Sequence, residues 1–415
     1  MTLSEELTWR GFVNQTTYKD ISVLDGEPIT FYWGVDPSAP SMTVGNFAAA
    51  MMVRKFIQYG HKPVLLVGGA TGMIGDPDGK ADERNLKTLE EIAANKAGIT
   101  AQYKQIFEGE SFTIVDNYDW FQNIGYLQFL RDIGKHVPMR QMLQREFVGS
   151  RLGEDGSGIS YAEFSYVLIQ AYDFLQLYRD HGVTLQLCGS DQWGNSIAGV
   201  DLIRRIDGAE ANVWSTPLVI NKATGKKFGK SEDGAVWLDP AKTSPTQFYQ
   251  FWINADDEGV ADYLKIFTEL NNEEIEAVLA EHETNKGARH AQTVLAREVT
   301  AIVHGTQSME IAAAVTQYLT GKSPIAEADE AALQALRAEI PAVTTTADAS
   351  ILETLLEAGL VESLSEGRRL LQGNGISVNG AKVSRETFEP GDFQSGRLLL
   401  KKGKKFKDSA LVELQ

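Results

Sequence analysis

Up to about residue 225, short apolar runs rich in β-branched residues alternate with longer stretches that have helical apolar spacing. The predicted strands are 29–34, 64–69, 111–115, 184–188 and 218–220, and the predicted helices are 47–59, 163–178 and 193–205. This alternation predicts an α/β fold with a Rossmann-like, doubly wound, mainly parallel sheet and helices on both faces. Ligands bind such sheets beyond the carboxyl ends of the strands, so chemistry is expected in the turns after Gly34, Gly69 and Cys188.

From Ser244 onward the pattern is helical only, and Ser244 can cap a helix that starts at Pro245. A stretch with linker composition follows at 341–350, and beyond it lies a small module with a turn at Asn379-Gly380 between short strands. We expect an α/β domain over 1–230 and a helical domain over 231–335. A linker over 336–350 and a small α+β module over 351–415 are expected to follow.

The composition is that of a globular protein: 415 residues with 43% hydrophobic and 23% charged residues suggest two or three domains. We find no run of signal-peptide or membrane-span type. Cys188 is the only cysteine, which excludes an internal disulfide or a cysteine-based metal cluster and fits a reducing compartment. We therefore expect a cytoplasmic protein without a membrane partner, in which any metal arrives with a substrate.

The net charge of −17 argues against a protein that binds DNA or RNA with its whole surface. The charge is uneven, because residues 351–415 hold ten Lys and Arg against nine Asp and Glu. Six basic residues fall within eleven positions that contain no acid: Arg397, Lys401, Lys402, Lys404, Lys405 and Lys407. This pattern fits either a local site for a polyanion or a solubilising tail.

The run Lys227-Phe228-Gly229-Lys230-Ser231 places two ammonium groups and a hydroxyl on a loop with a glycine hinge. Such a loop can close over a polyphosphate. It is not a Walker A loop, because only three residues separate Gly225 from Gly229, where that motif needs four. By composition alone, the run could also be a solvated surface turn.

The helix predicted over 163–178 carries Tyr166, Gln170 and Asp173 at i, i+4 and i+7, which puts a phenol, an amide and a carboxylate on one stripe. Buried polar groups need partners, so this stripe indicates a small polar ligand unless it simply faces water. Two glycine-containing turns that follow strands, 68–76 and 189–195, permit close approach of a ligand to the backbone. In the second turn, Asp191 is placed to accept hydrogen bonds from a ribose.

Together the segments GGATGMIGDP, YAEFSYVLIQAYDF, LQLCGSDQWGN and KFGKS resemble the bacterial tyrosyl-tRNA synthetases, which are class I aminoacyl-tRNA synthetases. The motifs occur in family order at family spacing, and the resemblance covers nearly the whole chain. It implies that Tyr32 and Asp173 bind the phenol hydroxyl of tyrosine. It further implies that Tyr166, Asp76 and Gln170 bind the ammonium group of tyrosine. Additional polar groups of the tyrosine pocket are expected to be Asn117, Gln186 and Gln192.

The resemblance also implies an ATP site and a set of groups that stabilise the departing pyrophosphate. The ATP site comprises Gly34, Asp36, Ser38, Gly45, Gly189, Asp191 and Lys230, and the catalytic groups comprise Lys80, Arg84, Lys227, Lys230 and Ser231 together with Thr43 and Asn46. One motif departs from the family, because Thr43-Val44-Gly45-Asn46 stands where His-Ile-Gly-His is usual. Thr43 cannot carry charge near the terminal phosphates, so we expect Ser38 and the cations to compensate.

The C-terminal module resembles the S4-type RNA-binding domain, which favours an RNA site over a solubilising tail. Its expected RNA-binding residues are Arg368, Arg369, Lys401, Lys402, Lys404 and Lys405. The implied partners are L-tyrosine, ATP with Mg²⁺ as a substrate, and tRNA(Tyr), with no protein-bound metal. The resemblance also implies a homodimer with its interface near residues 120–160.

Two alternatives remain open from the sequence. A tryptophanyl-type synthetase shares this architecture, but an indole offers no hydroxyl to Tyr32 and Asp173. A synthetase-like RNA-binding protein with weakened or lost catalysis is the other alternative, and Thr43 is its best support. The intact KFGKS loop and the tyrosine stripe favour an enzyme, because RNA binding alone has no need of them.

Overall fold

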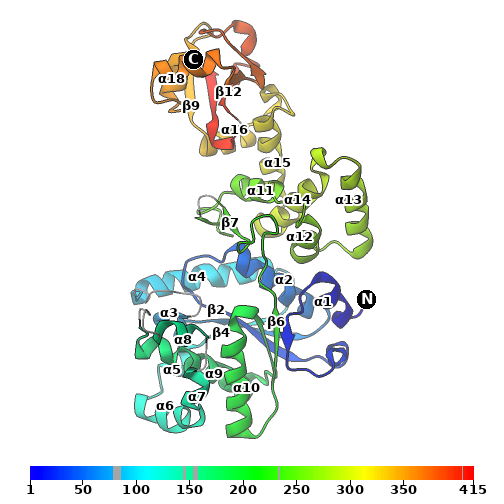
Figure 1. Ribbon diagram of the computed structural model, residues 1–415, viewed down its shortest axis with the longest axis vertical. Helices are drawn as coiled ribbons and strands as arrows, with labels where there is room; N and C mark the ends of the chain where they lie inside the picture. The colour runs from blue at the N-terminus through cyan, green and yellow to red at the C-terminus, as the bar shows by residue number, and fades with distance from the viewer. Residues whose placement is uncertain (78–85, 144–145, 153–157, 232–233, 404) are drawn as a thin grey trace. The chain divides into compact units, whose positions relative to one another are not determined.

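The computed structural model describes residues 1–415 except 78–85, 144–145, 153–157, 232–233 and 404. The chain divides into two compact units, and each is discontinuous in sequence. The first unit comprises Met1–Lys242 and Ala255–Leu295, and the second comprises Thr243–Asn254 and Ala296–Gln415. The first unit contains the predicted α/β domain (Figure 1).

The first unit is built on a six-stranded sheet in the order β1-β6-β5-β2-β3-β4, in which only β1 runs antiparallel to its neighbour. In sheet order the strands are β1 (Gln15–Thr16), β6 (Asn212–Thr216), β5 (Leu185–Gly189), β2 (Thr30–Val35), β3 (Lys62–Val67) and β4 (Thr113–Asp116). The predicted doubly wound parallel sheet is confirmed. The strand order reverses between β2 and β5, where Tyr32 pairs with Gln186. Such a switch point is where open α/β sheets bind ligands.

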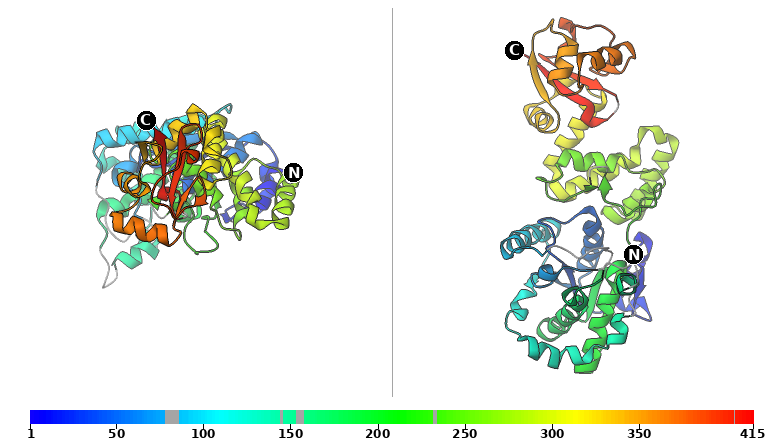
Figure 2. Two further views of the ribbon diagram at one scale, coloured as in Figure 1. Left: turned by 90° about the horizontal axis from the view of Figure 1, so that it is seen from above. Right: turned by 60° about the vertical axis from the view of Figure 1, so that its left-hand side comes forward.

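Helices cover both faces of this sheet, with α2 and α4 on one face and α9 and α10 on the other (Figures 1 and 2). The alternation of side chains along β2 explains this arrangement, because Tyr32 packs against Phe174 of α9 while Trp33 packs against Tyr103 of α4. The helices of the first unit are α1 (Leu3–Arg10), α2 (Val44–Gln58), α3 (Thr71–Ile74), α4 (Leu89–Ile106), α5 (Tyr118–Phe121), α6 (Tyr126–Asp132), α7 (Met139–Leu143), α8 (Glu146–Leu152), α9 (Tyr161–His181), α10 (Trp193–Asp207), α12 (Val260–Phe267) and α13 (Asn272–Thr284).

The predicted strand 218–220 is wrong. Its last residue, Ile220, forms only an isolated bridge with Lys227, so the segment is the base of a turn. After it come the short antiparallel strands β7 (Lys230–Ser231) and β8 (Gly234–Ala235).

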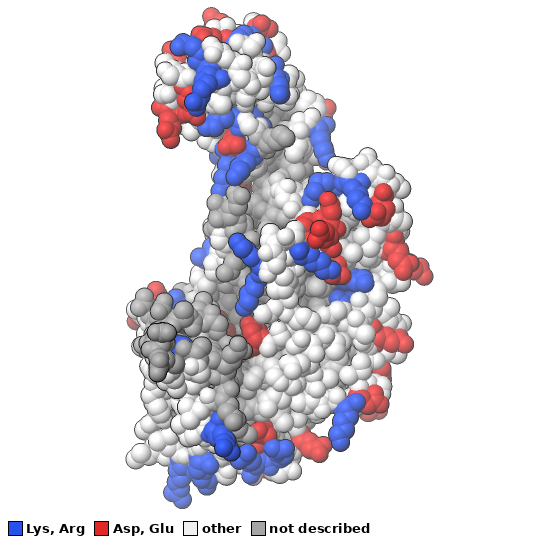
Figure 3. Space-filling model, in the orientation of Figure 1, with Lys and Arg blue, Asp and Glu red and all other residues white. Residues whose placement is uncertain are grey.

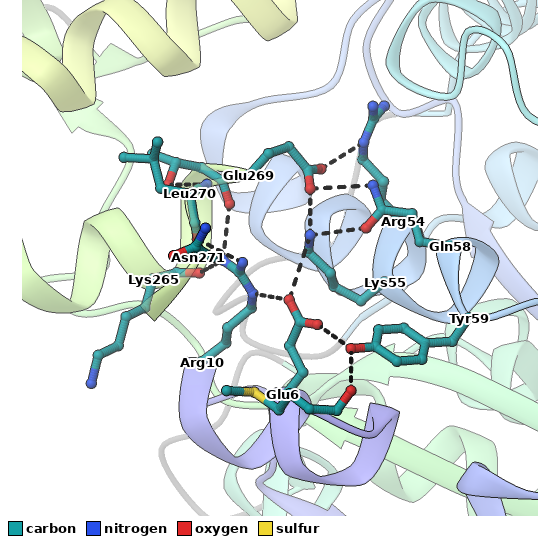
Figure 4. A network of polar contacts seen from close by, with 12 residues as sticks. Glu6, Arg10, Arg54, Lys55, Gln58, Tyr59, Lys265, Glu269, Leu270 and Asn271 are labelled. Atoms are coloured by element: carbon teal, nitrogen blue, oxygen red, sulfur yellow. Dashed lines mark hydrogen bonds and ion pairs between the residues drawn. The ribbon is translucent and has the colours of Figure 1, made fainter. Parts of the chain in front are cut away.

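A polar network joins the N-terminal helix to the part of the first unit that lies far along the chain (Figure 4). Arg10 donates from its guanidinium to the carbonyl oxygens of Lys265, Thr268 and Leu270 at 2.6, 2.9 and 2.9 Å. The Arg10 side chain is buried, and its Nε also pairs with Glu6 at 2.7 Å. We call this set the Arg10 network. It fixes α1 against the segment that follows α12.

The second unit combines helices with a five-stranded sheet in the order β11-β10-β12-β13-β9. Its helices are α11 (Pro245–Ile253), α15 (Thr306–Thr320), α16 (Glu330–Glu339), α17 (Ile351–Glu357) and α18 (Leu364–Gln372), while α14 (His290–His304) crosses the boundary between the units. Its strands are β9 (Ala342–Thr345), β10 (Ile376–Val378), β11 (Ala381–Lys382), β12 (Arg397–Lys402) and β13 (Ser409–Leu414). Ser244 caps α11 by accepting a hydrogen bond from the backbone N–H of Gln247 at 3.1 Å, as the sequence predicted.

The predicted linker 336–350 is structured, which corrects that part of the expected organisation. It contains the end of α16 and strand β9, which pairs in parallel with β13. Both faces of the C-terminal sheet are covered. Leu398 and Leu400 pack in a core that includes α17, while Leu399 and Leu411 pack in a second core with α15 and α16. The C-terminal module is therefore continuous with α15 and α16.

No helix in the described parts of the chain has the length and apolar character needed to cross a membrane.

Candidate functional site

The switch point of the first sheet brings together the residues predicted to bind tyrosine. Tyr32 lies in β2 and Gln186 in β5, directly paired in register. Asn117 follows the last residue of β4, and α9 contributes Asp173. All four side chains are at least 97% buried, so polar groups have been brought into an apolar interior. Such groups need hydrogen-bond partners, either from the protein or from a ligand.

Asp173 is held by two donors. Asn117 donates from Nδ2 to Oδ2 at 3.0 Å, and Trp120 donates from Nε1 to Oδ1 at 3.0 Å. Burial raises the pKa of the Asp173 carboxyl well above its ordinary value, and these two hydrogen bonds act in the opposite direction. The carboxylate is thus fixed in orientation while some of its acceptor capacity remains for a ligand.

Three polar atoms in the same region are buried without a hydrogen-bond partner among the described residues. They are the hydroxyl of Tyr32, Oε1 of Gln170 and Oε1 of Gln186. Burial raises the pKa of Tyr32 well above its ordinary value, and the nearby Asp173 raises it further, so the phenol stays protonated and can donate. Each unpartnered atom costs on the order of 1–3 kcal/mol if it stays unsatisfied. A small ligand with complementary donors and acceptors would satisfy them.

A second cluster forms around Asp36, which follows β2. Tyr166 donates from its hydroxyl to Asp36 Oδ2 at 2.7 Å, and Thr71 donates to Oδ1 at 2.6 Å. The stripe predicted on 163–178 therefore faces the site rather than water. The cluster also explains the glycine at 68, because a Cβ there would lie 2.3 Å from Asp36 Oδ1 and 2.2 Å from Thr71 Oγ1.

Asp76 and Gln192 meet across the site, although 116 positions separate them in the chain. Gln192 donates from Nε2 to Asp76 Oδ2 at 2.5 Å, and Asn195 donates to Gln192 Oε1 at 3.1 Å. The two predicted residues are thus brought together, and Asn195 orients the amide. Their predicted roles toward tyrosine remain predictions.

Thr43 and Asn46 form the start of α2. Asn46 Oδ1 accepts hydrogen bonds from both the backbone N–H and the hydroxyl of Thr43, each at 3.0 Å. The bond from the Thr43 backbone N–H to the Asn46 side chain is one half of a capping box and stabilises the helix N-terminus. The two residues that depart from the family pattern therefore bond to each other, which gives them a structural reason independent of charge.

The loop 227–231, which we call the lysine loop, lies next to the start of α2. A Cβ on Gly229 would lie 3.2 Å from Val44 Cβ and 3.3 Å from the backbone nitrogen of Gly45, so the two segments are in direct contact. Gly229 has φ +92°, which favours glycine. Phe228 anchors the loop by packing on Tyr263 of α12 with ring centroids 4.3 Å apart.

The side chain of Lys227 is exposed, as a cation that meets a ligand must be. Lys230 and Ser231 have a described backbone in β7, but their side chains lie outside the described residues, as do Lys80 and Arg84 altogether. The remaining ATP-side predictions lie at or near the carboxyl ends of β2 and β5 and at the start of α2. Gly34, Ser38, Gly45 and Asp191 are exposed, Asp36 and Gly189 are half-buried, and a Cβ on Gly189 would lie 2.6 Å from Asp191 Oδ1.

The predicted RNA-binding residues are not equivalent in the structure. Arg369 and Lys405 are exposed, and Arg368 pairs with Glu386 at 3.0 Å on the surface. Lys401 is half-buried and donates from Nζ to the carbonyl of Leu319 at the end of α15, at 3.2 Å. Burial lowers the pKa of Lys401.

Lys402 pairs with Glu366 at 3.4 Å, and Lys404 lies outside the described residues. Figure 3 shows basic and acidic side chains mixed over this module. On the face that Figure 3 shows, the exposed cations of the module are therefore interspersed with acidic side chains.

Sequence reasoning missed Trp120 and Thr71, and it also missed Gln102, which bonds to Ser41 and to the backbone N–H of Met42. Trp120 and Thr71 contact predicted site residues, and Thr71 stands inside the quoted motif GGATGMIGDP. For Trp120, the only sequence signal was its place three residues after Asn117. Gln102 lies on α4, for which no helix was predicted. No group of three or more potential metal ligands occurs among the described residues.

Comparisons with known proteins agree with this geometry. The family described as tRNA synthetases class I (W and Y) matches residues 24–320, and the C-terminal domain family of tyrosine–tRNA ligases, described as SYY-like, matches 332–407. The chain is 45% identical to a tyrosine–tRNA ligase of Streptomyces coelicolor, covering 99% of this chain and 98% of that protein. It is 42% identical to tyrosine–tRNA ligase 2 of Bacillus cereus, with full coverage of both chains.

Solved structures give the same answer. The crystal structure of a C-terminally truncated mitochondrial tyrosyl-tRNA synthetase of Aspergillus nidulans matches with a TM-score of 0.69 and 30% identity, covering 77% of this chain and 94% of that chain. The resemblance predicted from the motifs is thereby confirmed: the chain belongs to the class I tRNA synthetases of the tryptophan and tyrosine family.

Proposed function

We propose that this protein is a tyrosine–tRNA ligase, which activates L-tyrosine with ATP and transfers it to tRNA(Tyr). The observation that carries the proposal is the buried hydroxyl of Tyr32, which has no partner among the described residues and lies near the carboxylate of Asp173. A substrate phenol fits this pair, because its hydroxyl can accept from Tyr32 and donate to Asp173. A phenyl ring offers no polar atom to this pair, and an indole, whose N–H can only donate, would leave the Tyr32 hydroxyl without an acceptor.

The reaction has two steps, and neither needs a nucleophile from the protein. The tyrosine carboxylate attacks the α-phosphorus of ATP, forming tyrosyl-adenylate and releasing pyrophosphate. A ribose hydroxyl at the 3′ end of the tRNA then attacks the carbonyl carbon of the adenylate, and AMP leaves. The protein contributes by holding the reactants in line and by stabilising negative charge that develops on the leaving groups.

The tyrosine side of the site is held by polar groups that are already in place. Tyr166 and Asp36 are bonded to each other, and Gln192 is bonded to Asp76, so carboxylate oxygens and an amide line the region expected to receive the ammonium group. Gln170 and Gln186 present buried carbonyl oxygens that lack partners among the described residues, and these can accept from N–H groups of the substrate. On this basis we assign Tyr166, Gln170, Gln186, Gln192 and Asp76 to tyrosine binding, whereas Asp36, which accepts from Tyr166, stays in the proposed ATP site.

The ATP side combines the start of α2 with the lysine loop. A helix N-terminus favours anionic groups, and Gly45 is exposed there. The exposed Lys227 belongs to the loop whose Gly229 contacts this helix start, and Lys80, Arg84, Lys227, Lys230 and Ser231 are assigned to charge stabilisation from the motifs. Mg²⁺ accompanies ATP as part of the substrate, because oxygen-rich phosphates are the ligands it prefers.

Two further partners belong to this proposal. The exposed cations Arg369 and Lys405 support tRNA binding by the C-terminal module, since such cations neutralise phosphates. A second copy of the chain is proposed to cover exposed apolar side chains in and next to the predicted interface, 120–160. Six large apolar side chains there are 47–79% exposed: Tyr126, Leu127, Met139, Leu143, Leu152 and Tyr161.

The test is pyrophosphate exchange by the purified full-length protein with tyrosine, with tryptophan and without an amino acid. Tyrosine-dependent exchange is expected, with tryptophan at background. Exchange with tryptophan instead of tyrosine would reassign the substrate. Absence of exchange with either amino acid would leave an RNA-binding protein and contradict the proposal.

A further inference from the structure

Helix α4 carries no family motif, yet three of its residues face the segment that leads into α2. Asn95, Gly98 and Gln102 stand at i, i+3 and i+7, which places them on one face of the helix. Asn95 donates from Nδ2 to the carbonyl of Pro37 at 2.9 Å. A Cβ on Gly98 would lie 2.0 Å from the carbonyl oxygen of Pro40, so the helix backbone itself contacts this segment.

Gln102 makes the most extensive of these contacts. Its Oε1 accepts from the backbone N–H of Met42 at 2.7 Å, and its Nε2 donates to Ser41 Oγ at 2.8 Å. The Ser41 hydroxyl donates to the carbonyl of Met42 at 2.8 Å and accepts from the backbone N–H of Asp239 at 3.1 Å. Gln102, Ser41 and Met42 are all buried. One amide is therefore connected to residue 42 directly and to residue 239 through a single hydroxyl.

Residues 42 and 239 belong to the two segments that lead to the predicted phosphate-facing groups. Residues 42–44 run into the start of α2, and 236–238 return from the lysine loop. The segments pair side by side, because Val44 donates from its backbone N–H to Val236 at 3.0 Å and Leu238 donates to Met42 at 3.0 Å. Val236 also donates to the carbonyl of Gly229, at 3.0 Å. The backbone of the lysine loop is thus attached to α2 through this pairing.

We propose that Gln102 is a positioning residue for the ATP side of the reaction, because its amide fixes the paired segments 41–44 and 236–239 on helix α4. The inference rests on the proposed function. Gln102 is buried behind these segments and acts through their backbone, so its effect falls on ATP and not on tyrosine. A displacement of about 1 Å at reacting groups can cost roughly a hundredfold in rate, which makes a buried amide at this junction consequential.

The experiment is pyrophosphate exchange by full-length Gln102→Leu, with ATP and tyrosine varied separately. We expect kcat/KM for ATP to fall by roughly ten- to a hundredfold, while KM for tyrosine stays within about twofold of the unmodified protein. Gln102→Glu keeps an acceptor for Met42 N–H and loses the donor to Ser41, so its loss should be smaller. Ser41→Ala should reproduce the ATP-selective loss.

A double-mutant cycle separates positioning from general loss of stability. Gln102→Leu and Ser41→Ala should be non-additive in kcat/KM for ATP, because they disrupt the same connection. The matched control is Gln250→Leu in the second unit, which removes the bond from an amide to Thr316 Oγ1 at 2.6 Å. It should lower the thermal midpoint and leave both KM values unchanged.

Equal changes in KM for ATP and tyrosine, an additive cycle or unchanged ATP kinetics would each overturn the inference. If Gln102→Leu does not fold, Ser41→Ala and Gln102→Glu decide the question by the same criterion. Failure of the proposed function looks different, because the unmodified protein itself would then show no tyrosine-dependent exchange.

Discussion

At the scale of single residues, the site is recognised by polar atoms that the described protein leaves unsatisfied. The Tyr32 hydroxyl is buried and has no partner among the described residues, whereas the equally buried Tyr103 hydroxyl donates to the carbonyl of Leu66 at 2.9 Å. Both tyrosines lie in the first unit. They differ in whether a described residue accepts a hydrogen bond from the hydroxyl. A phenol with an internal partner contributes to stability, and a phenol without one is available for a ligand.

This contrast gives a prediction for Tyr32→Phe. Removal of its hydroxyl breaks no hydrogen bond within the described parts of the chain, so the thermal midpoint should stay the same or rise. Exchange with tyrosine should fall by roughly tenfold in kcat/KM, and discrimination against phenylalanine should decrease, because one bond to the substrate hydroxyl is lost. Tyr103→Phe is the control. It should cost about 1 kcal/mol of stability and leave discrimination intact. If Tyr32→Phe instead lowered stability and left discrimination against phenylalanine intact, Tyr32 would not be a residue of the tyrosine site.

A second prediction concerns pH and Asp173. Burial raises its pKa in the folded protein, so the folded state binds the proton more tightly than the unfolded chain does. The protein therefore loses stability as the pH rises from the unfolded pKa through the folded one. Asp173→Asn removes this loss. We expect the variant to be more stable than the unmodified protein near neutral pH, with the difference shrinking toward about pH 4.

Denaturant unfolding across this pH range measures the difference, and Asp207→Asn is the control of opposite sign. Hydrogen bonds from Arg179 lower the pKa of Asp207, so its contribution is present above the unfolded pKa and is lost as the pH falls through the folded pKa. A gain for Asp173→Asn that does not depend on pH would contradict the assignment. The same variant should lose most tyrosine-dependent exchange.

The motifs identified most of the residues that the structure brings to the switch point, because family spacing encodes their positions. Trp120 was not predicted as a site residue, because its contact with Asp173 depends on how the segment after β4 folds toward α9. Gln170 and Gln186 were named from the sequence, but that their Oε1 atoms lack partners could be learned only from the surrounding packing.

At the scale of secondary-structure elements, the start of α2 shows how the chain accommodates its unusual motif. Asn46 caps the N-terminus by accepting two hydrogen bonds from Thr43. A histidine at 43 would lack the hydroxyl that makes one of them. The start of α2 is also held by backbone hydrogen bonds between 42–44 and 236–238. Because these bonds do not involve the side chain of residue 43, we expect a substitution there to leave the position of the helix start largely unchanged.

We therefore predict that Thr43→His changes the pyrophosphate exchange rate by less than Lys230→Ala does. Loss of a cation that meets the departing pyrophosphate should cost on the order of 3 kcal/mol, roughly a hundredfold. Loss of one capping bond should cost about 1 kcal/mol, mainly in stability. Exchange rates and thermal midpoints of both variants provide the comparison. A larger rate effect at Thr43 would mean that this hydroxyl contacts the nucleotide.

Elements with strong alternation were predicted well, and those with weaker signals were not. Strands β2 to β5 fall close to the predicted runs, whereas 218–220 has strand composition but forms, among the described residues, just an isolated bridge at Ile220. Helix α4 was not predicted, although Thr88 and Glu91 form a capping box at its start and Ile92, Ile99 and Tyr103 supply its buried face. The capping signal was present in the sequence.

At the scale of the whole molecule, the division into units departs from the order of the sequence. Residues 255–295 belong to the first unit, and the stretch predicted as a linker contributes β9 to the C-terminal sheet. Composition alone could not reveal this, because β9 gains its structure only by pairing with β13, about seventy positions later. The proposed homodimer also belongs to this scale.

A variant at the most exposed of these apolar residues tests the dimer. Leu127 is 79% exposed on α6, and a twofold interface would bring both copies of such a residue into or near the contact. Leu127→Asp should shift sedimentation from dimer to monomer, because charged residues are disfavoured at the core of an interface. Leu89→Asp changes a 60% exposed leucine outside 120–161 and should leave the dimer intact. A monomer before any substitution would refute the proposed assembly.

The Arg10 network has a consequence for how the protein is made. The carbonyls that satisfy the Arg10 guanidinium lie 255 to 260 positions later in the chain. During synthesis, the first helix therefore emerges from the ribosome long before its partners exist. The Arg10 guanidinium remains solvated until the chain has been extended to residue 270. Nascent chains halted before that point should leave the amino terminus open to proteases, even where the parallel strands have already assembled.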